Sequence, residues 1–380
     1  MNKIKKLIKE LCPNGVEWKK LEEVCEIGTG NSNRQDATDN GQYPFFVRSK
    51  DVLKIDTFEY SEESIIIPGE GGIGDIFHYI KGKYALHQRA YRVHPISDKL
   101  CGKFLYYYLF ANFKLYINSK AVNATVTSIR KPMLEGFPIP LPPLPIQTEI
   151  VRILDKFVEQ QEQIERLIEL RKKQYEYYRE ELLKPKEGEV WETKRLGEIG
   201  TFVRGNGLQK TDFREEGVGC IHYGQIYTYY GMFTNKTKSF VSPELASKLK
   251  KVEQGDIVLA CTSENIEDVC MCVVWEGEET IVTGGHSSIY KHNENPRFIA
   301  YFLKSKAFEV QKIKYAYGAK VIDIKNDDLE KIYILLPSRE KQDEIVESLN
   351  KFESYIESLS FALESSRRRY EYYRDEMLRF

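Results

Sequence analysis

The chain has 380 residues, of which 42% are hydrophobic and 30% are charged, and its formal net charge is −1. This length suits two or three domains, and the apolar fraction is too high for a disordered chain. No run of about 18 apolar residues occurs, so the sequence predicts no membrane-spanning helix. The basic start MNKIKKLIKELC lacks the apolar block of a secretory signal, and the seven cysteines show no C-x-x-C pair. We therefore expect reduced cysteines and a cytoplasmic location.

The first 146 residues predict a β-rich globular segment with short helices. Strands are expected in YPFFVRSKDV, which begins at Tyr43, and in SIIIPGEGG, which begins at Ser64. The aromatic stretch GKFLYYYLFANF, from Gly102, is expected to form a helix that packs on the sheet. Residues 185–341 show comparable stretches in the same order, namely VGCIHYGQIY, GDIVLACTSEN and PRFIAYFLKSKAF.

The letters GEGGIG in the first segment place Gly69, Gly71 and Gly74 in the spacing G-x-G-x-x-G after an apolar strand. A dinucleotide fingerprint needs a helix that begins at this point, because the helix N-terminus binds the pyrophosphate. The letters that follow, DIFHYIKGKYALHQ, alternate as a strand does. We interpret the glycines as a tight loop and expect no cofactor in this chain.

A long stretch of the sequence occurs twice at an offset of 195 residues. YEYYREELL begins at Tyr175 and YEYYRDEML begins at Tyr370, and IRKPMLEGFPIPLPP likewise matches IKNDDLEKIYILLPS. Near Trp18 and Trp191, WKKLEEV…GTGN matches WETKRLGEI…VRGN at a slightly different offset. Such self-similarity indicates an internal duplication. We therefore predict an α+β protein with globular segments at 1–146 and 185–341, each followed by a long helix, at 147–184 and 342–380.

Both helical segments carry apolar residues at alternating spacings of three and four, which is the pattern of a coiled coil. The alternative is two separate amphipathic helices, each packed on its own domain. The predicted interface positions are Ile150, Leu154, Phe157, Gln161, Ile164, Ile168, Tyr175, Tyr178 and Leu182 in the first helix, and Ile345, Leu349, Phe352, Ile356, Leu359, Leu363, Ser366, Tyr370, Tyr373 and Met377 in the second.

The polar positions favour antiparallel pairing of the two helices. That direction pairs Gln161 with Ser366, Phe157 with Tyr370, and Tyr175 with Phe352. A parallel pairing would place Gln161 against Ile356 and bury an amide without a partner, at a cost of about 1–3 kcal/mol. An antiparallel pair would hold the two globular segments apart and relate them by a pseudo-twofold axis.

No catalytic centre is evident in the sequence. The six histidines have no metal-ligand spacing, and there is no P-loop and no Asn/Asp-Pro-Pro-Tyr/Phe tetrapeptide of amino methyltransferases. The net charge is +4 over residues 1–146 and zero over 184–341. This is weaker than the basic surface of a protein that binds DNA alone, but it is compatible with DNA binding inside an assembly.

Two variable globular segments, each ending in a proline-rich hinge that leads into a repeated helix, resemble the specificity subunit of type I restriction-modification enzymes. The hinge PLPPLPIQTEIV, from Pro140 to Val151, is the most specific part of the resemblance, whereas the second copy keeps only Pro337, Gln342, Ile345 and Val346. The resemblance implies two target-recognition domains, each reading half of an interrupted DNA sequence. It also implies that the helices set the spacer and dock two methyltransferase subunits, and that the chain itself is not an enzyme. S-adenosylmethionine, ATP and magnesium would then belong to methyltransferase and restriction subunits.

The candidate DNA-binding residues are polar and basic side chains in matching loops, which can donate to or accept from base edges. Each could also be an ordinary solvated loop residue. They are Arg48, Ser49, Lys50, His87, Gln88, Arg89, Thr125, Thr127 and Arg130 in the first segment, and Tyr223, Gln225, Thr262, Ser263, His286, Ser287, Lys320 and Lys325 in the second. The alternative function is a coiled-coil scaffold that holds two protein partners apart without binding DNA. The target sequence is not readable from the chain.

Overall fold

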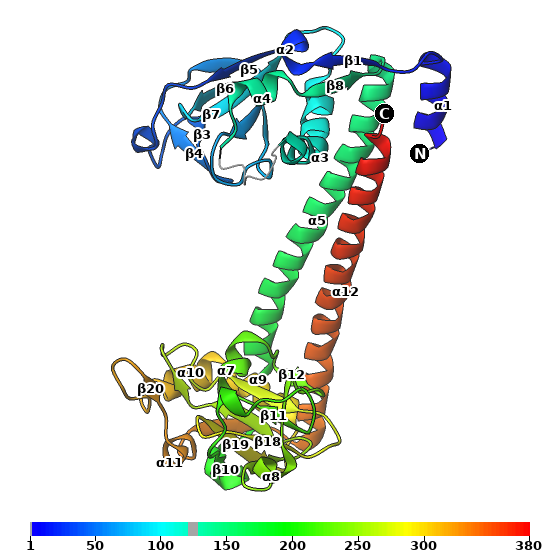
Figure 1. Ribbon diagram of the computed structural model, residues 1–380. Coiled ribbons are helices and arrows are strands. Elements are labelled where there is room, and N and C mark those ends of the chain that lie inside the picture. Colours follow the sequence, from blue (N-terminus) through cyan, green and yellow to red (C-terminus); the bar gives the residue numbers. More distant parts are fainter. Residues whose placement is uncertain (1, 121–127) are drawn as a thin grey trace. The chain divides into compact units, whose positions relative to one another are not determined.

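The computed structural model describes residues 2–120 and 128–380, and the chain divides into two compact units (Figure 1). Unit 1 comprises Met1–Arg166 and Ser360–Phe380, and unit 2 comprises Leu167–Leu359. The predicted α+β fold is confirmed, because each unit holds one β-rich domain and the two long helices pair in antiparallel fashion. The helices α5 (Leu144–Leu182) and α12 (Arg339–Met377) each contribute to both units. The predicted domain boundaries along the chain stay a prediction.

The first domain, the globular part of unit 1, is built on a six-stranded mixed sheet with the order β2-β7-β5-β6-β3-β4. The run Ile65–Ile66–Ile67 is fully buried in β5, the central position where β-branched residues pack best. A separate two-stranded sheet joins β1 to β8. The strands are β1 (Glu17–Lys20), β2 (Cys25–Thr29), β3 (Tyr43–Phe46), β4 (Val52–Ile55), β5 (Tyr60–Pro68), β6 (His78–Leu86), β7 (Ala90–Pro95) and β8 (Pro138–Leu141).

Helices cover this sheet and extend its core toward the long helices. The aromatic face of α3 packs on β5 and β6, as expected from the sequence. Ile4 of α1 joins the same apolar core as Met377 and Leu378, near the end of α12 (Figure 1). The helices of unit 1 besides α5 and α12 are α1 (Asn2–Leu11), α2 (Leu21–Val24), the 3-10 turn η1 (Arg34–Asp36), α3 (Gly102–Lys120) and α4 (Lys131–Glu135).

The second domain, the globular part of unit 2, spreads its strands over two main sheets, ordered β10-β19-β15-β17-β12 and β13-β11-β18-β14. The pairs β16-β20 and β21-β9 are separate. The strands are β9 (Glu192–Arg195), β10 (Gly200–Arg204), β11 (Val218–Ile221), β12 (Phe233–Thr234), β13 (Ser239–Val241), β14 (Lys250–Val252), β15 (Ile257–Ala260), β16 (Thr262–Ser263), β17 (Cys272–Trp275), β18 (Ile281–Thr283), β19 (Ser287–His292), β20 (Ile322–Asp323) and β21 (Tyr333–Leu336).

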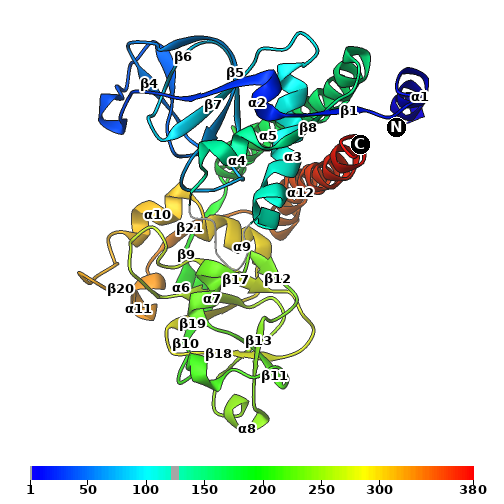
Figure 2. The ribbon, with the colours of Figure 1, turned by 45° about the horizontal axis from the view of Figure 1, so that its top comes forward.

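Short helices complete the second domain, and α9 lies beside β17 (Figure 2). Where the first domain has the continuous α3, the second has two helices, α9 and α10, separated by Lys304 and Ser305. The helices are α6 (Leu196–Ile199), the 3-10 turn η2 (Lys210–Asp212), α7 (Tyr223–Thr228), α8 (Pro243–Ala246), α9 (Pro296–Leu303), α10 (Lys306–Lys312) and α11 (Asn326–Leu329).

The two domains repeat the same strand pairings. The antiparallel pairs β2–β7 and β5–β7 of the first domain correspond to β10–β19 and β15–β19 of the second. The parallel pair β3–β6 corresponds to β11–β18. The edge pairs β1–β8 and β21–β9 also match. The duplication seen in the sequence is therefore a duplication of topology.

Within unit 1, α5 and α12 run in opposite directions. The rings of Phe157 and Tyr370 meet edge to face with centroids 6.4 Å apart, as predicted, and further along α5 Glu165 pairs with Arg367. Because the partner number falls as the α5 number rises, the pairing is antiparallel. Gln161 lies between these two contacts in α5, and Ser366 is next to Arg367 in α12. Each has a buried polar atom without a hydrogen-bond partner.

Within unit 2 the same direction holds, but one predicted pair was wrong. Tyr178, not Tyr175, stacks on Phe352 with ring centroids 5.3 Å apart. The Tyr175 hydroxyl donates to Glu353 at 2.6 Å. The pairing in this part of the helices is thus shifted by up to about one turn from the expected register. The shift is possible because Tyr175 and Tyr178 are successive interface positions of α5 and both carry an aromatic ring. Further along α5 toward its start, the Arg171 guanidinium lies over the Tyr355 ring of α12.

A buried glutamine links each domain to its long helix. Gln147 accepts from the Cys101 amide at 2.8 Å and donates to the carbonyls of Lys99 and Pro142, each at 2.7 Å. Gln342 accepts from the Asn295 amide at 3.0 Å and donates to the Pro337 carbonyl and the Glu294 carboxylate. Each glutamine follows the hinge that leads into its long helix. Its side chain therefore ties the loop before α3 or α9 to the hinge and to the first turn of α5 or α12.

We expect Gln147→Ala and Gln342→Ala each to lower the free energy of unfolding by about 2–3 kcal/mol, because each leaves buried backbone groups unsatisfied. Chemical denaturation of the whole chain measures the effect. Gln163→Ala, an exposed position of α5, is the control and should change stability by less than about 0.5 kcal/mol. Equal effects of all three substitutions would contradict the role given to the two buried glutamines.

Candidate nucleic-acid interface

Four of the predicted residues of the first domain lie at one end of its sheet. Arg48 follows β3, and His87, Gln88 and Arg89 form the turn between β6 and β7. They line an open hollow of about 680 Å³ together with three residues that the sequence analysis missed, and we call this the first-domain hollow; its lining is Asn33, Arg34, Gln35, Arg48, His87, Gln88 and Arg89.

Two backbone segments approach closely next to the residues that line this hollow. A Cβ atom at Gly30 would collide with the carbonyl of Leu86, so only glycine lets the segment that leads to η1 cross the end of β6. Gly205 has the same relation to Gly284 in the second domain. The repeated letters GN in the two halves are therefore explained by backbone packing, which brings η1 and η2 beside the candidate loops.

Glu70, which follows β5, joins two arginines of the first-domain hollow. Its carboxylate accepts from Nη1 of Arg48 at 2.7 Å and from Nη1 of Arg89 at 3.3 Å. The hydrogen bond from Arg48 lowers the pKa of Glu70, and Arg89 adds to the effect. The sequence analysis missed Glu70, although its position two residues after a buried strand, like that of Thr262, could have indicated it.

His87 and Gln88 are held by neighbours within the hollow. The Arg89 amide donates to Nδ1 of the buried His87 at 2.9 Å, which leaves Nε2 as the protonated nitrogen of the neutral ring. Burial lowers the pKa of His87, and the charges of Arg48 and Arg89 lower it further. Gln88 donates to the side-chain oxygen of Asn33 at 2.6 Å.

The other first-domain candidates are not part of the hollow's lining. Ser49 and Lys50 lie in the turn between β3 and β4, where the Ser49 hydroxyl donates to the Asp51 carbonyl at 3.1 Å. Arg130 is exposed at the N-cap of α4. Thr125 and Thr127 lie outside the described residues.

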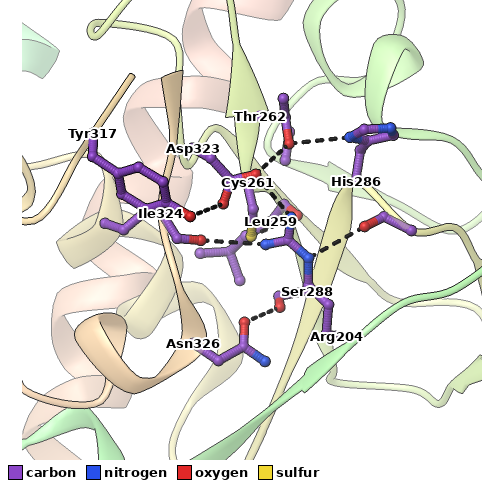
Figure 3. Close-up of polar contacts among 12 residues, drawn as sticks. Arg204, Leu259, Cys261, Thr262, His286, Ser288, Tyr317, Asp323, Ile324 and Asn326 are labelled. Atoms are coloured by element: carbon purple, nitrogen blue, oxygen red, sulfur yellow. Dashed lines mark hydrogen bonds and ion pairs between the residues drawn. The ribbon is translucent and has the colours of Figure 1, made fainter. Parts of the chain in front are cut away.

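The second domain places a different polar cluster at the matching end of its sheet (Figure 3). Asp323 accepts from the Thr262 hydroxyl at 2.9 Å and from Nη2 of Arg204 at 3.0 Å. His286 Nδ1 lies 3.2 Å from the Thr262 hydroxyl oxygen, and the Arg204 Nε donates to the Gly285 carbonyl. Thr262 and His286 were predicted, whereas Asp323 and Arg204 were not. We call these four residues the second-domain cluster.

Tyr223 extends this cluster, since its ring centroid lies 4.8 Å from that of His286. Three further candidates of this domain are Ser263, Lys320 and Lys325. Ser263, in β16, accepts from the Asn265 amide at 3.3 Å, and the Lys325 ammonium lies 5.4 Å from the Tyr317 ring centroid. Lys320 is exposed.

Two further second-domain candidates are buried, and their role as base contacts stays a prediction. Gln225 is 8% exposed, donates to the Ser239 hydroxyl at 2.6 Å and accepts from the His222 amide at 3.3 Å. The sequence suggested a strand that runs into a loop, but α7 begins at Tyr223 and uses Gln225 to cap its own N-terminus. Ser287 is fully buried as the first residue of β19.

All nineteen predicted interface positions lie in α5 or α12, and all but Tyr178 are buried or half-buried. Ring contacts across the two helices are established for five of them, namely Phe157, Tyr370, Tyr373, Tyr178 and Phe352. The list as a whole stays a prediction of the interface.

Among the described residues no helix is long and apolar enough to cross a membrane, and no group of three His, Cys, Asp or Glu side chains is placed to hold a metal ion.

Known proteins share this architecture. The family described as "Type I restriction modification DNA specificity domain" matches residues 13–172 and 188–363, and the chain therefore belongs to this family. A putative type I restriction enzyme specificity subunit of Haemophilus influenzae is 29% identical over 390 residues, covering 96% of each chain. The EcoR124I/EcoR124II specificity subunit of Escherichia coli is 31% identical over 254 residues, covering 64% of this chain and 63% of that one.

The fold also resembles solved structures. The type I restriction-modification S subunit of M. genitalium superposes with a TM-score of 0.56 at 18% identity, covering 96% of each chain. At this identity the likeness establishes a shared fold.

We expect the imidazole of His87 to titrate below 6.5, because burial and two guanidinium groups disfavour its charged form. Glu70→Gln should lower this pKa further, since the Glu70 charge opposes the shift. NMR titration of the ring protons measures both effects, with His78, whose pKa is lowered mainly by its own burial, as the internal control. A His87 pKa that rises in the variant would contradict this electrostatic account.

Proposed function

We propose that the chain is the DNA sequence-recognition subunit of a type I restriction-modification enzyme, with each domain reading one half of a bipartite target. One observation carries this proposal: two copies of one topology place unlike polar clusters at the same end of the sheet. A duplicated framework with diverged hydrogen-bonding groups suits the reading of two different base sequences. A scaffold without DNA binding gives no reason for this divergence.

We place the chemistry of the enzyme in partner subunits. The titratable side chains of the two clusters are engaged in hydrogen bonds and ion pairs that position them, such as those of Glu70 and Asp323. In this proposal methyltransferase subunits bring S-adenosylmethionine, and restriction subunits bring ATP and magnesium. The chain then contributes recognition of double-stranded DNA.

The long helices are the proposed docking sites for two methyltransferase subunits. Tyr177 in α5 and Tyr372 in α12 are equivalent in the duplication and are 62% and 60% exposed. Exposed aromatic residues at repeated positions suit two identical contacts, since aromatic side chains often dominate the energy of an interface. Leu170 and Phe361 are comparably exposed, but neither has an apolar counterpart in the other repeat.

We expect Tyr177→Ala and Tyr372→Ala each to weaken the docking of one methyltransferase subunit by about tenfold or more. The double variant should lose both subunits. The mass of the purified complex, measured at a series of concentrations, reports the stoichiometry. Leu170→Ala serves as the control and should keep two subunits; if it released them as readily as Tyr177→Ala, the repeated tyrosines would not mark the docking sites.

Mapping of methylated adenines in DNA from cells that carry the complete system tests the proposed function. We expect a bipartite target with two unlike halves and a spacer of constant length. A continuous target, or the absence of any target with the methyltransferase present, would overturn the proposal.

The same mapping tests whether the paired helices set the spacer. Insertion of one heptad into both helices adds about 10 Å of helix, and at about 3.4 Å per base pair the spacer should grow by about three base pairs. Insertion into one helix alone is the control, because it breaks the pairing register and should abolish recognition. An unchanged spacer in the doubly lengthened variant would show that the helices do not determine it.

A further inference from the structure

Two arginines of the first-domain hollow are held by a carboxylate, and this bears on whether they bind phosphate or a base edge. Arg48 and Arg89 come from different strand ends, and their side chains are 42% and 57% exposed. Each donates to the single carboxylate of Glu70 through its Nη1 atom, so each keeps further N–H donors for a ligand. The arginines are therefore oriented and still accessible.

An ionised carboxylate between two arginines disfavours phosphate binding at this position. Phosphate contacts depend on net positive charge, and Glu70 cancels part of it. Its pKa is lowered by both arginines, so it is ionised at neutral pH. A guanine edge, in contrast, is uncharged and offers the acceptors O6 and N7, which an oriented guanidinium group can bind with two hydrogen bonds. Orientation before binding also reduces the entropy lost by the long side chain.

The second domain provides an internal comparison. Thr262 occupies the position of Glu70, two residues after the central strand. The residues before them also correspond. The Gly69 carbonyl accepts from the Ile129 amide, and the Cys261 carbonyl accepts from the Ile324 amide. His286 corresponds to Arg89 and Tyr223 to Arg48, by their positions next to β19 and β11. The arrangement of two arginines on one carboxylate is thus particular to the first domain.

We propose that Glu70 is a positioning residue that commits Arg48 and Arg89 to guanine, so that the half-site read by the first domain contains guanine at the positions these arginines contact. This inference rests on the proposed function and deepens it, because it names the base class that one domain selects. Gln88, held by Asn33, and Arg34 add further donors to the same hollow.

The test uses the whole chain in complex with its methyltransferase and a set of duplexes that carry every single-base change in the first half-site. Arg48→Ala or Arg89→Ala should reduce discrimination at one G·C position by about 5- to 150-fold and leave the second half-site unchanged. Glu70→Gln should reduce discrimination at the same positions while strengthening the binding of unrelated DNA at low salt. A merely structural role for Glu70 would weaken both kinds of binding.

Asp98→Asn is the control for the change in net charge, since Asp98 is exposed beyond the opposite end of β7. It should leave discrimination intact. A wild-type complex without any sequence preference would refute the proposed function itself. A wild-type complex with a bipartite target, but with no G·C position in the first half that responds to these three substitutions, would refute this inference alone.

Discussion

The hydrogen bonds of Gln147 and Gln342 are the constraint on which the arrangement of each unit depends. Each glutamine is buried, and each joins the loop before α3 or α9 to the proline hinge and to the first turn of a long helix. Because an amide side chain offers both donors and an acceptor, one residue satisfies several backbone groups that the turn of the chain leaves without partners. Each domain is thereby tied to the helix that follows it.

The duplication separates what the chain must keep from what it can change. Strand pairing, the glutamine junctions, and the close contacts of Gly30 and Gly205 recur in both halves, because backbone hydrogen bonds and steric exclusion permit few substitutions there. The loops at the strand ends are less constrained, because their side chains need only a neighbour that holds them in position. Glu70 with its arginines and Asp323 with Thr262 and Arg204 are two solutions at one place in the fold. Such a framework lets recognition diverge without loss of the fold.

Sequence reasoning succeeded where a pattern extends over many residues and was less reliable for single side chains. The antiparallel direction of the helices followed from where polar residues interrupt the apolar spacing. The pairing of Tyr175 with Phe352 did not hold, because Tyr178 one turn away offers an equivalent ring. Gln225 illustrates the same limit, because the sequence suggested a strand that runs into a loop, whereas α7 begins at Tyr223 and Gln225 caps it.

The sequence by itself determined the duplication, the two β-rich domains, the long helices and their direction, because each of these leaves a periodic or repeated signal in the chain. It also located most of the loops that form the first-domain hollow. The tertiary structure alone decided which side chains meet: Glu70 reaches Arg48 and Arg89 across three strand ends, and Arg204 reaches Asp323 over more than a hundred residues of chain. Contacts between distant segments depend on strand order and backbone spacing, and neither property is encoded in a local pattern.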